Sequence, residues 1–208
     1  MMLVYLIIGA TALVSVTAFS NRDLFVKLLF NANIIRSNRQ WYRFVTHAFV
    51  HADWIHLFMN MYVLFMFGKI VEEQYIELFG AVKGRLYFFL LYFISTAAAS
   101  LPSYEKHKHN IAYSAVGASG AVSAVLFSAI FLDPGMKLNL FFPPVRNVPA
   151  PIFGVLYLVY CWYAAKHARD NVAHDVHYWG SIFGIVFTLV IYHQSFFNFI
   201  EAVKNLFG

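Results

Sequence analysis

Six long apolar stretches divide this chain, and their length limits what it can fold into. Each is roughly long enough to cross about 30 Å of hydrocarbon, allowing for tilt and short extensions. In lipid the backbone must satisfy its own hydrogen bonds, so we expect α-helices, and no alternating barrel pattern is present. The stretches are Leu3–Phe19, Trp54–Phe67, Leu86–Leu101, Ile111–Leu132, Ala150–Ala165 and Tyr178–Phe199.

The composition agrees with a membrane protein. Of the 208 residues 61% are hydrophobic and 12% are charged, whereas a soluble domain has about 25% charged residues. This number of charged residues is too small to cover a water-facing surface. Most of the surface should therefore face lipid. The first stretch lacks a basic segment before it and a convincing cleavage site after it, which predicts a retained helix. We expect residues 1–208 to form a single, all-α, polytopic domain.

The connectors between the stretches carry the charge. The net charge is +5, but the cations are spread over short connectors, which argues against nucleic acid and favours the lipid bilayer as partner. The long connector Ser20–Asp53 mixes Arg with Phe and Trp, as an element folded in the membrane interface would. The connector Gly68–Arg85 reads as a charged, water-facing turn. The single cysteine, Cys161, excludes an intramolecular disulfide and a CxxC site.

Polar residues inside apolar stretches are the natural candidates for function, because each costs free energy unless it is paired or hydrated. No Asp, Glu, Lys or Arg falls inside the six stretches. The polar residues that stand out there or beside them are His56, Asn60, Ser119 and His177.

Ser119 lies in the sequence Gly117-Ala118-Ser119-Gly120, within the fourth stretch. Small residues such as these often serve only helix packing in membranes. Glycines also let a substrate carbonyl approach a serine near a helix N-terminus, where unpaired N–H groups can stabilise an oxyanion. Ser119 is therefore a candidate nucleophile.

His177 precedes a pair of glycines, Gly180 and Gly184, on one helix face. A GxxxG face permits close contact with another helix of small residues, and Gly120 and Ala124 offer such a face. If the two faces meet, His177 comes close to Ser119. An interfacial structural histidine is the alternative.

His56 and Asn60 are four residues apart, so they point the same way from one helix. Both can donate side-chain hydrogen bonds, as a developing oxyanion requires, although a polar helix–helix contact would need the same pair. His47, His51 and His56 raise the possibility of zinc, but no HExxH arrangement is present, so we expect neither a metal nor another cofactor.

The order of these motifs resembles that of the rhomboid intramembrane serine proteases. The resemblance covers about Trp41 to Gly184, most of the chain. It rests on Arg43, Thr46, His51, His56-x-x-x-Asn60, Gly68-x-x-x-Glu72, Gly117-Ala118-Ser119-Gly120 and His177-x-x-Gly180-x-x-x-Gly184, in that order.

The resemblance implies a six-transmembrane-helix bundle and a Ser–His dyad without an acidic third member. Ser119 would attack the peptide carbonyl and His177 would act as general base. The oxyanion would bind His56, Asn60 and the Ser119 N–H. Gly117, Gly120, His51, Gly180 and Gly184 would support the site. Substrates would be single-span membrane proteins.

We expect an integral, multi-pass protein of the bacterial inner (cytoplasmic) membrane. The sequence departs from the family pattern at Ser123, where many relatives have an aromatic ring, and around Val176–Gly180. One alternative is an inactive rhomboid-like protein that binds membrane clients, although such proteins usually lack the serine or the histidine. A small transporter is the other, although it would commonly use an intramembrane carboxylate.

Overall fold

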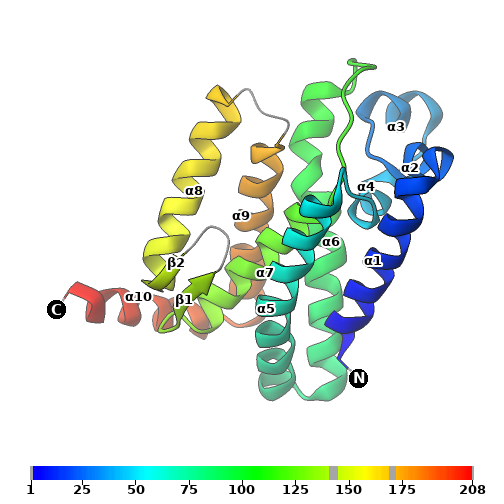
Figure 1. Ribbon diagram of the computed structural model, residues 1–208. Helices are drawn as coiled ribbons and strands as arrows, with labels where there is room; N and C mark the ends of the chain where they lie inside the picture. Colours follow the sequence, from blue (N-terminus) through cyan, green and yellow to red (C-terminus); the bar gives the residue numbers. More distant parts are fainter. Residues whose placement is uncertain (1, 141–144, 169–171, 208) are drawn as a thin grey trace.

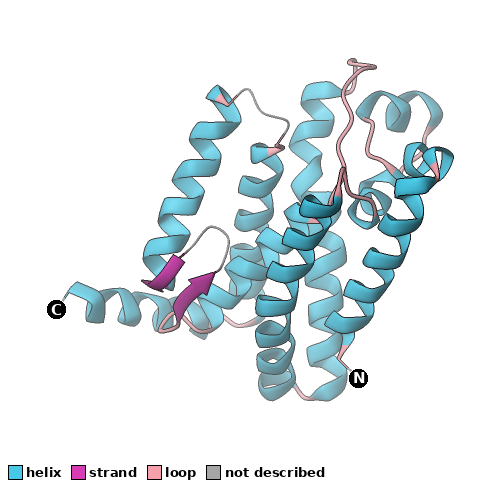
Figure 2. Cartoon of the chain, viewed as in Figure 1, coloured by secondary structure: helices cyan, strands magenta, loops and turns pink. Residues whose placement is uncertain are grey.

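The computed structural model describes residues 2–140, 145–168 and 172–207, and these are mostly helical (Figure 2). One short antiparallel hairpin accompanies the helices. The predicted all-α class is confirmed. The helices are α1 (Leu3–Ser20), α2 (Arg22–Leu28), α3 (Ala32–Asn38), α4 (Arg43–Thr46), η1 (His47–Phe49), α5 (Trp54–Phe79), α6 (Ala81–His107), α7 (Ser119–Leu132), α8 (Ala150–His167), α9 (His174–Ile191) and α10 (Gln194–Phe207). The hairpin strands are β1 (Lys137–Leu140) and β2 (Val145–Pro149).

Helix α7 lies at the centre of the bundle (Figure 1). Every residue from Gly120 to Ile130 is buried, as expected for a helix that is apolar on all sides. α5, α6, α8 and α9 pack against it, while α1 packs on α5 at the outside. The chain therefore buries the element that carries Ser119 more deeply than any long helix around it.

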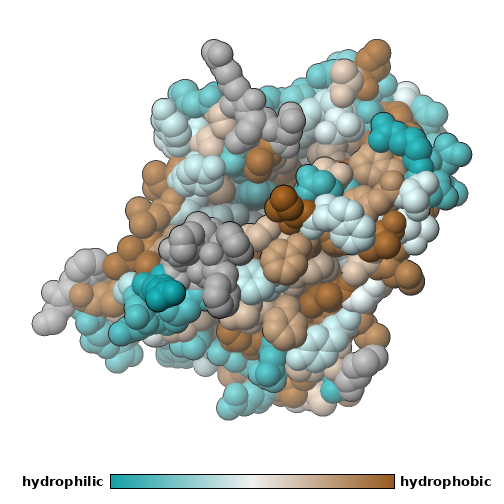
Figure 3. Space-filling view, in the orientation of Figure 1, coloured by the Kyte–Doolittle hydropathy of each residue, from teal (hydrophilic) through white to brown (hydrophobic). Residues whose placement is uncertain are grey.

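The flanks of the bundle suit a lipid environment. Large apolar side chains are widely exposed there, for example Leu13 (70%), Ile55 (76%) and Val190 (79%). Apolar side chains cover much of the flank, whereas hydrophilic ones gather towards the ends (Figure 3). In the part of the chain that the structure describes, three helices, α1, α5 and α6, are individually long and apolar enough to span a membrane. The chain is thus an integral membrane protein.

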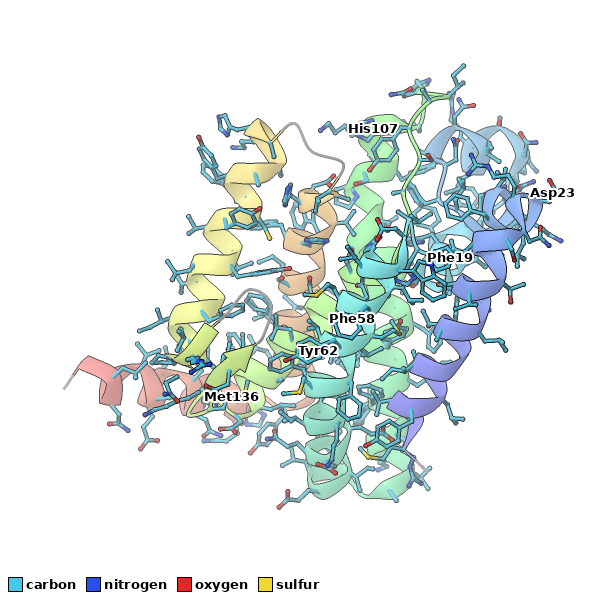
Figure 4. The ribbon with its side chains drawn as sticks, viewed as in Figure 1. Phe19, Asp23, Phe58, Tyr62, His107 and Met136 are labelled. Carbon is cyan, nitrogen blue, oxygen red and sulfur yellow. The ribbon has the colours of Figure 1, made fainter. Side chains whose placement is uncertain are left out.

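The central helix is short for a span. α7 has 14 residues, which corresponds to about 21 Å, whereas the hydrocarbon core measures about 30 Å. His107, the last residue of α6, lies near one end of the molecule, and Met136, which follows α7, lies towards the other (Figure 4). Ser119 begins α7 at the end of this helix away from Met136.

The prediction that residues Gly68–Arg85 form a water-facing turn is wrong. α5 continues through Glu72 and Glu73 to Phe79, and only Gly80, at a φ of 81°, separates it from α6. The charged residues therefore lie on α5 and α6, which extend beyond the apolar stretches. The helices can continue there because their backbone hydrogen bonds are internal and their charged side chains can reach water.

Two other helix boundaries differ from the expected ones. The fourth stretch is helical only from Ser119, since residues 111–118 form an extended loop in which Ala115 and Phe30 exchange backbone hydrogen bonds of 2.9 and 3.0 Å. The sixth stretch breaks after Ile191, where α9 ends, and α10 leaves at 115° to it. Apolar composition alone could not distinguish these loops from helix.

The connector Ser20–Asp53 is a folded element, as expected. Arg43 is 4% exposed and organises it. Its guanidinium donates to the carbonyl oxygens of Val26 (2.8 Å) and Leu29 (2.6 Å) and to Gln40 Oε1 (2.7 Å). Burying this cation is tolerable because three acceptors surround it. The element is thereby fixed next to the loop that leads to Ser119.

Candidate active site

Ser119 is the first residue of α7 and is partly exposed. The N–H groups in the first turn of a helix have no partner within the helix, so they are available to an oxygen that binds there. A backbone hydrogen bond fixes the loop before Ser119: the Gly117 N–H donates to the carbonyl oxygen of His47 at 3.0 Å. A partly exposed hydroxyl thus lies at the amino end of a rigidly held, buried helix.

Gly117 allows an imidazole to approach the backbone of this loop. Its φ is 111°, a conformation that favours glycine. A Cβ at this position would lie 2.6 Å from both Cε1 and Nε2 of His56, so no side chain fits. His56 therefore packs directly on the backbone two residues before Ser119, an arrangement that the spacing of the motifs alone could not predict.

His51 supports the same loop and is completely buried. Its Nε2 accepts a hydrogen bond from the Ala118 N–H (3.3 Å), and its Nδ1 lies 2.9 Å from Ser15 Oγ. Ser15 donates its hydroxyl hydrogen to the carbonyl oxygen of Phe49 (2.8 Å), so Nδ1 of His51 must be the donor. Burial, assisted by the neighbouring histidines His56 and His47, lowers the pKa of His51 to about 3. His51 is thus a neutral support that ties α1 to the residue before Ser119.

His56 and Asn60 lie on the first two turns of α5. Asp53 begins the helix by accepting the His56 N–H at 2.7 Å. Nδ1 of His56 accepts from the Ala52 N–H at 3.5 Å, which leaves the ring proton on Nε2, the atom that faces Gly117. Asn60 donates one amide hydrogen to the His56 carbonyl oxygen (2.9 Å) and has a second to offer. Both side chains can therefore act as donors.

The two predicted small-residue faces meet. A Cβ on Gly180 would lie 2.2 Å from the carbonyl oxygen of Gly120, and one on Gly184 would lie 2.2 Å from that of Ala124. α7 and α9 are therefore in backbone contact over two turns, which confirms the predicted packing.

His177 is in the first turn of α9 and is partly buried. Its backbone N–H donates to Ala173 (3.2 Å), and its carbonyl accepts from Ser181 Oγ (2.8 Å). The residue before it, Val176, would be 2.8 Å from a Cβ on Gly120, the residue after Ser119. Ser119 and His177 are thus the sequence neighbours of Gly120 and Val176, which contact each other. Both residues lie at the beginning of their helices, α7 and α9.

The neighbouring polar residues of α9 have different partners. The ring of His174 packs edge-on against Tyr160 of α8, with centroids 5.4 Å apart, and also against the ring of His177, with centroids 6.1 Å apart. Asp175 accepts a hydrogen bond from Ser103 Oγ of α6 at 2.6 Å. The carboxylate of Asp175 is therefore bonded to α6.

Ser123, which departs from the family pattern, contacts an aromatic residue of another helix. Ser123 Oγ lies 3.0 Å from the hydroxyl of Tyr157 on α8. An aromatic ring from a different helix therefore lies at the turn after Ser119, and the hydrogen bond joins α8 to α7.

A small pocket lies beside Ser119, and sequence analysis missed the part of its lining that α6 contributes. The pocket has room for about one water molecule and is partly open to solvent. Its lining includes the polar residues His47, Ser100, Ser103, Tyr113 and Ser119. The signal in the sequence was the recurrence of small hydroxyl residues at Thr96, Ser100 and Ser103, which places them along one side of α6.

Comparison with known families gives a match to part of the chain. The model of the Rhomboid domain matches residues 38–194, about three quarters of the chain. The matched region begins in the folded connector and ends at the start of α10, so it contains every candidate site residue.

Two curated relatives, both from Arabidopsis thaliana, are similar to parts of the chain. Rhomboid-like protein 11, chloroplastic, is 40% identical over 82 residues, which cover 39% of this chain and 26% of the relative. RHOMBOID-like protein 12, mitochondrial, is 27% identical over 147 residues, 66% of this chain and 42% of the relative. The chain thus spans less than half the length of either. Both names refer to organelles, so they give no support to a bacterial inner membrane.

Proposed function

This chain belongs to the rhomboid family, and we propose that it is an intramembrane serine protease that hydrolyses peptide bonds of single-span membrane proteins. The observation that carries the proposal is the backbone contact of α7 with α9, because it brings the first turns of the two helices, with Ser119 and His177, to the same end of the bundle. The imidazole of His56, on α5, packs against the loop that leads to Ser119.

In the proposed reaction, Ser119 Oγ attacks the scissile carbonyl carbon while His177 removes the hydroxyl proton. His177 then gives this proton to the leaving amine, and an acyl-enzyme remains. Water, deprotonated by His177, attacks the acyl carbon, and its proton returns to Ser119 Oγ as the acid leaves. The N–H of Ser119, Nε2–H of His56 and the second N–H of Asn60 would stabilise each oxyanion.

Hydrolysis inside a bilayer needs a supply of water. The pocket beside Ser119 supports the proposal, since Ser100, Ser103 and Tyr113 offer hydroxyl groups to water there. The short α7 agrees with it as well, because a helix of 14 residues, about 21 Å long, does not cross a hydrocarbon core of about 30 Å, so one of its ends would lie within the membrane. A substrate helix would have to unwind locally to present its carbonyl, so helix-breaking residues near the cut should help.

The test is cleavage of a panel of single-span proteins by the full chain in liposomes. We expect Ser119→Ala and His177→Ala each to lower the rate by at least about 10⁴-fold, with an unchanged unfolding temperature. Ser37→Ala and His193→Ala, which replace exposed residues, serve as controls and should cleave normally. Full activity of either dyad variant would refute the dyad.

Labelling with a serine-directed fluorophosphonate separates the protease from an inactive client-binding protein. A protease should be labelled in the unchanged chain and not in Ser119→Ala. A folded protein that neither reacts with the probe nor cleaves any member of the panel would favour the client-binding alternative. The membrane in which the protein resides, predicted as the bacterial inner membrane, stays a prediction that fractionation of the source cells can test.

A further inference from the structure

Helix α10 differs from the spanning helices in its sequence pattern. Its apolar residues recur at spacings of three and four, so they form one face, and most of its polar residues form the other; Lys204 lies at one edge of the apolar face, one turn from Ile200. The apolar face consists of Phe196, Phe197, Phe199, Ile200, Val203 and Leu206. The polar face consists of Gln194, Asn198, Glu201 and Asn205. A spanning helix surrounded by lipid has no need of such a division.

The direction of α10 follows from its junction with α9. The two helices are bent by 115° at the break, closer to a right angle than to a straight continuation. Since α9 packs lengthwise on the central helix, α10 runs sideways away from the bundle, at the level where α7 ends, whereas α5 and α6 extend further (Figure 1). This level is at the end of α7 away from Ser119.

One side of α10 packs on the bundle, and a second side borders water. Phe199 stacks on Phe131, near the end of α7, with ring centroids 4.4 Å apart and planes 2° from parallel. On the polar side, Asn198 lines an open pocket together with Glu77 and Asp133, whose charges need water. One edge of α10 is therefore fixed to the bundle, and its polar face borders an aqueous space.

The remaining face is apolar and exposed. Phe196 is 47%, Phe197 59% and Ile200 37% exposed. This face continues the exposed apolar flank of the spanning helices, which in an integral membrane protein is covered by lipid. The two charged residues of α10, Glu201 and Lys204, are of opposite sign, so binding needs no anionic headgroups.

We propose that α10 lies in the bilayer interface at the level where α7 ends, away from Ser119, with Phe196, Phe197 and Ile200 inserted at the boundary between headgroups and acyl chains. Its partner is the lipid surface itself, with zwitterionic lipid sufficient. Through the Phe199–Phe131 stack, α10 holds the end of the central helix at that surface. This role does not depend on whether Ser119 is catalytic.

Spin labels on single cysteines test the proposal in the full chain. Cys161→Ser removes the native thiol, and labels are placed at Phe197 and Ile200 on the apolar face, with Asn198 and Glu201 as matched positions on the polar face. The protein is reconstituted in phosphatidylcholine vesicles. We expect the first two labels to collide severalfold more with oxygen, which dissolves in lipid, than with a water-soluble nickel chelate. The other two should show the reverse preference.

Two results would overturn the proposal. One is equal accessibility of all four positions to the nickel chelate, which would mean that α10 lies in water. The other is strong dipolar coupling between labels at Phe197 on separate molecules, which would mean that a second copy of the chain covers the apolar face. Unfolding temperatures of the four labelled proteins establish that each is folded.

Discussion

At the scale of single residues, the histidines of this protein differ in what their rings contact. His51 has protein partners on both ring nitrogens and is a support, whereas His56 directs Nε2 at the loop before Ser119. Identical side chains five residues apart thus differ through their hydrogen bonds, which fix the tautomer of each.

Replacement of His56 or Asn60, the side chains proposed to donate to the oxyanion, should lower kcat. We expect His56→Ala and Asn60→Ala each to lower kcat by about 10² to 10³-fold, because each removes a donor that acts in the transition state. Substrate cleavage in liposomes is the measurement. Asn33→Ala, in the folded connector, is the control and should retain kcat. Equal kcat for His56→Ala and the unchanged chain would remove His56 from the oxyanion site.

Buried neutral histidines should make the fold sensitive to acid. Burial lowers the pKa of His47 to about 4, from an ordinary value of 6.5. The unfolded chain therefore binds this proton first, so stability is complete above pH 6.5 and is lost as the pH falls towards 4. Between pH 6.5 and 5.5 the free energy of unfolding should fall by about 1 kcal/mol for this residue.

Thermal unfolding in detergent across this pH range measures the effect. His47→Gln should give a shallower slope, whereas His167→Gln, which replaces an exposed histidine, should leave it unchanged. An unaltered slope in His47→Gln would contradict the assignment of a neutral ring.

At the scale of helices, the contact of α7 with α9 determines the site. The two backbones touch because Gly180 and Gly184 lack side chains, so van der Waals contact replaces the hydrophobic driving force that is missing between helices in lipid. The hydrogen bond between Ser123 and Tyr157 adds a link from α7 to α8.

A methyl group in this contact should separate the helices. We expect Gly184→Ala to destabilise the protein by about 1–3 kcal/mol, because its Cβ would lie 2.2 Å from the Ala124 oxygen and the backbone would have to move. Gly9→Ala is the matched control, since nothing lies within 4 Å of its Cβ, and it should be neutral or slightly stabilising. Unfolding temperatures of both variants give the comparison, and equal values would mean that the contact adapts without cost.

At the scale of the whole molecule, a buried carboxylate joins the first long helix to the second. Glu72 is fully buried and accepts the N–H groups of Leu3 (2.7 Å) and Val4 (2.8 Å), with Arg85 Nε at 3.9 Å. A negative charge at the positive end of α1 is favourable, and it satisfies donors that the helix leaves unpaired.

Removal of this charge should loosen α1 from the bundle. We expect Glu72→Ala to lower the free energy of unfolding by about 1–3 kcal/mol, since the N–H groups of Leu3 and Val4 lose their acceptor. Glu73→Ala, which replaces an exposed carboxylate, should change it by less than about 0.5 kcal/mol. Limited proteolysis at the start of α1, together with unfolding temperature, measures the difference. Equal behaviour of the two variants would show that α1 is held by its apolar contacts alone.

Local sequence patterns sufficed to predict a helical membrane protein and the contact between two of its helix faces. Hydrophobicity and the spacing of small residues are local properties, so the class of fold and the contact of Gly120 and Ala124 with Gly180 and Gly184 could be predicted from them. The candidate residues Ser119 and His177 followed from the same spacing and from the order of the motifs.

Two features could be seen only in the folded chain: which apolar segments are helical, and what each polar group contacts. Residues 111–118 are as apolar as a helix, but their pairing with Phe30 keeps them extended. The carboxyl of Asp175 bonds to Ser103, 72 positions away, and His56 meets Gly117 across two helices. Such contacts join distant parts of the chain, and their geometry is fixed by packing rather than by any local pattern.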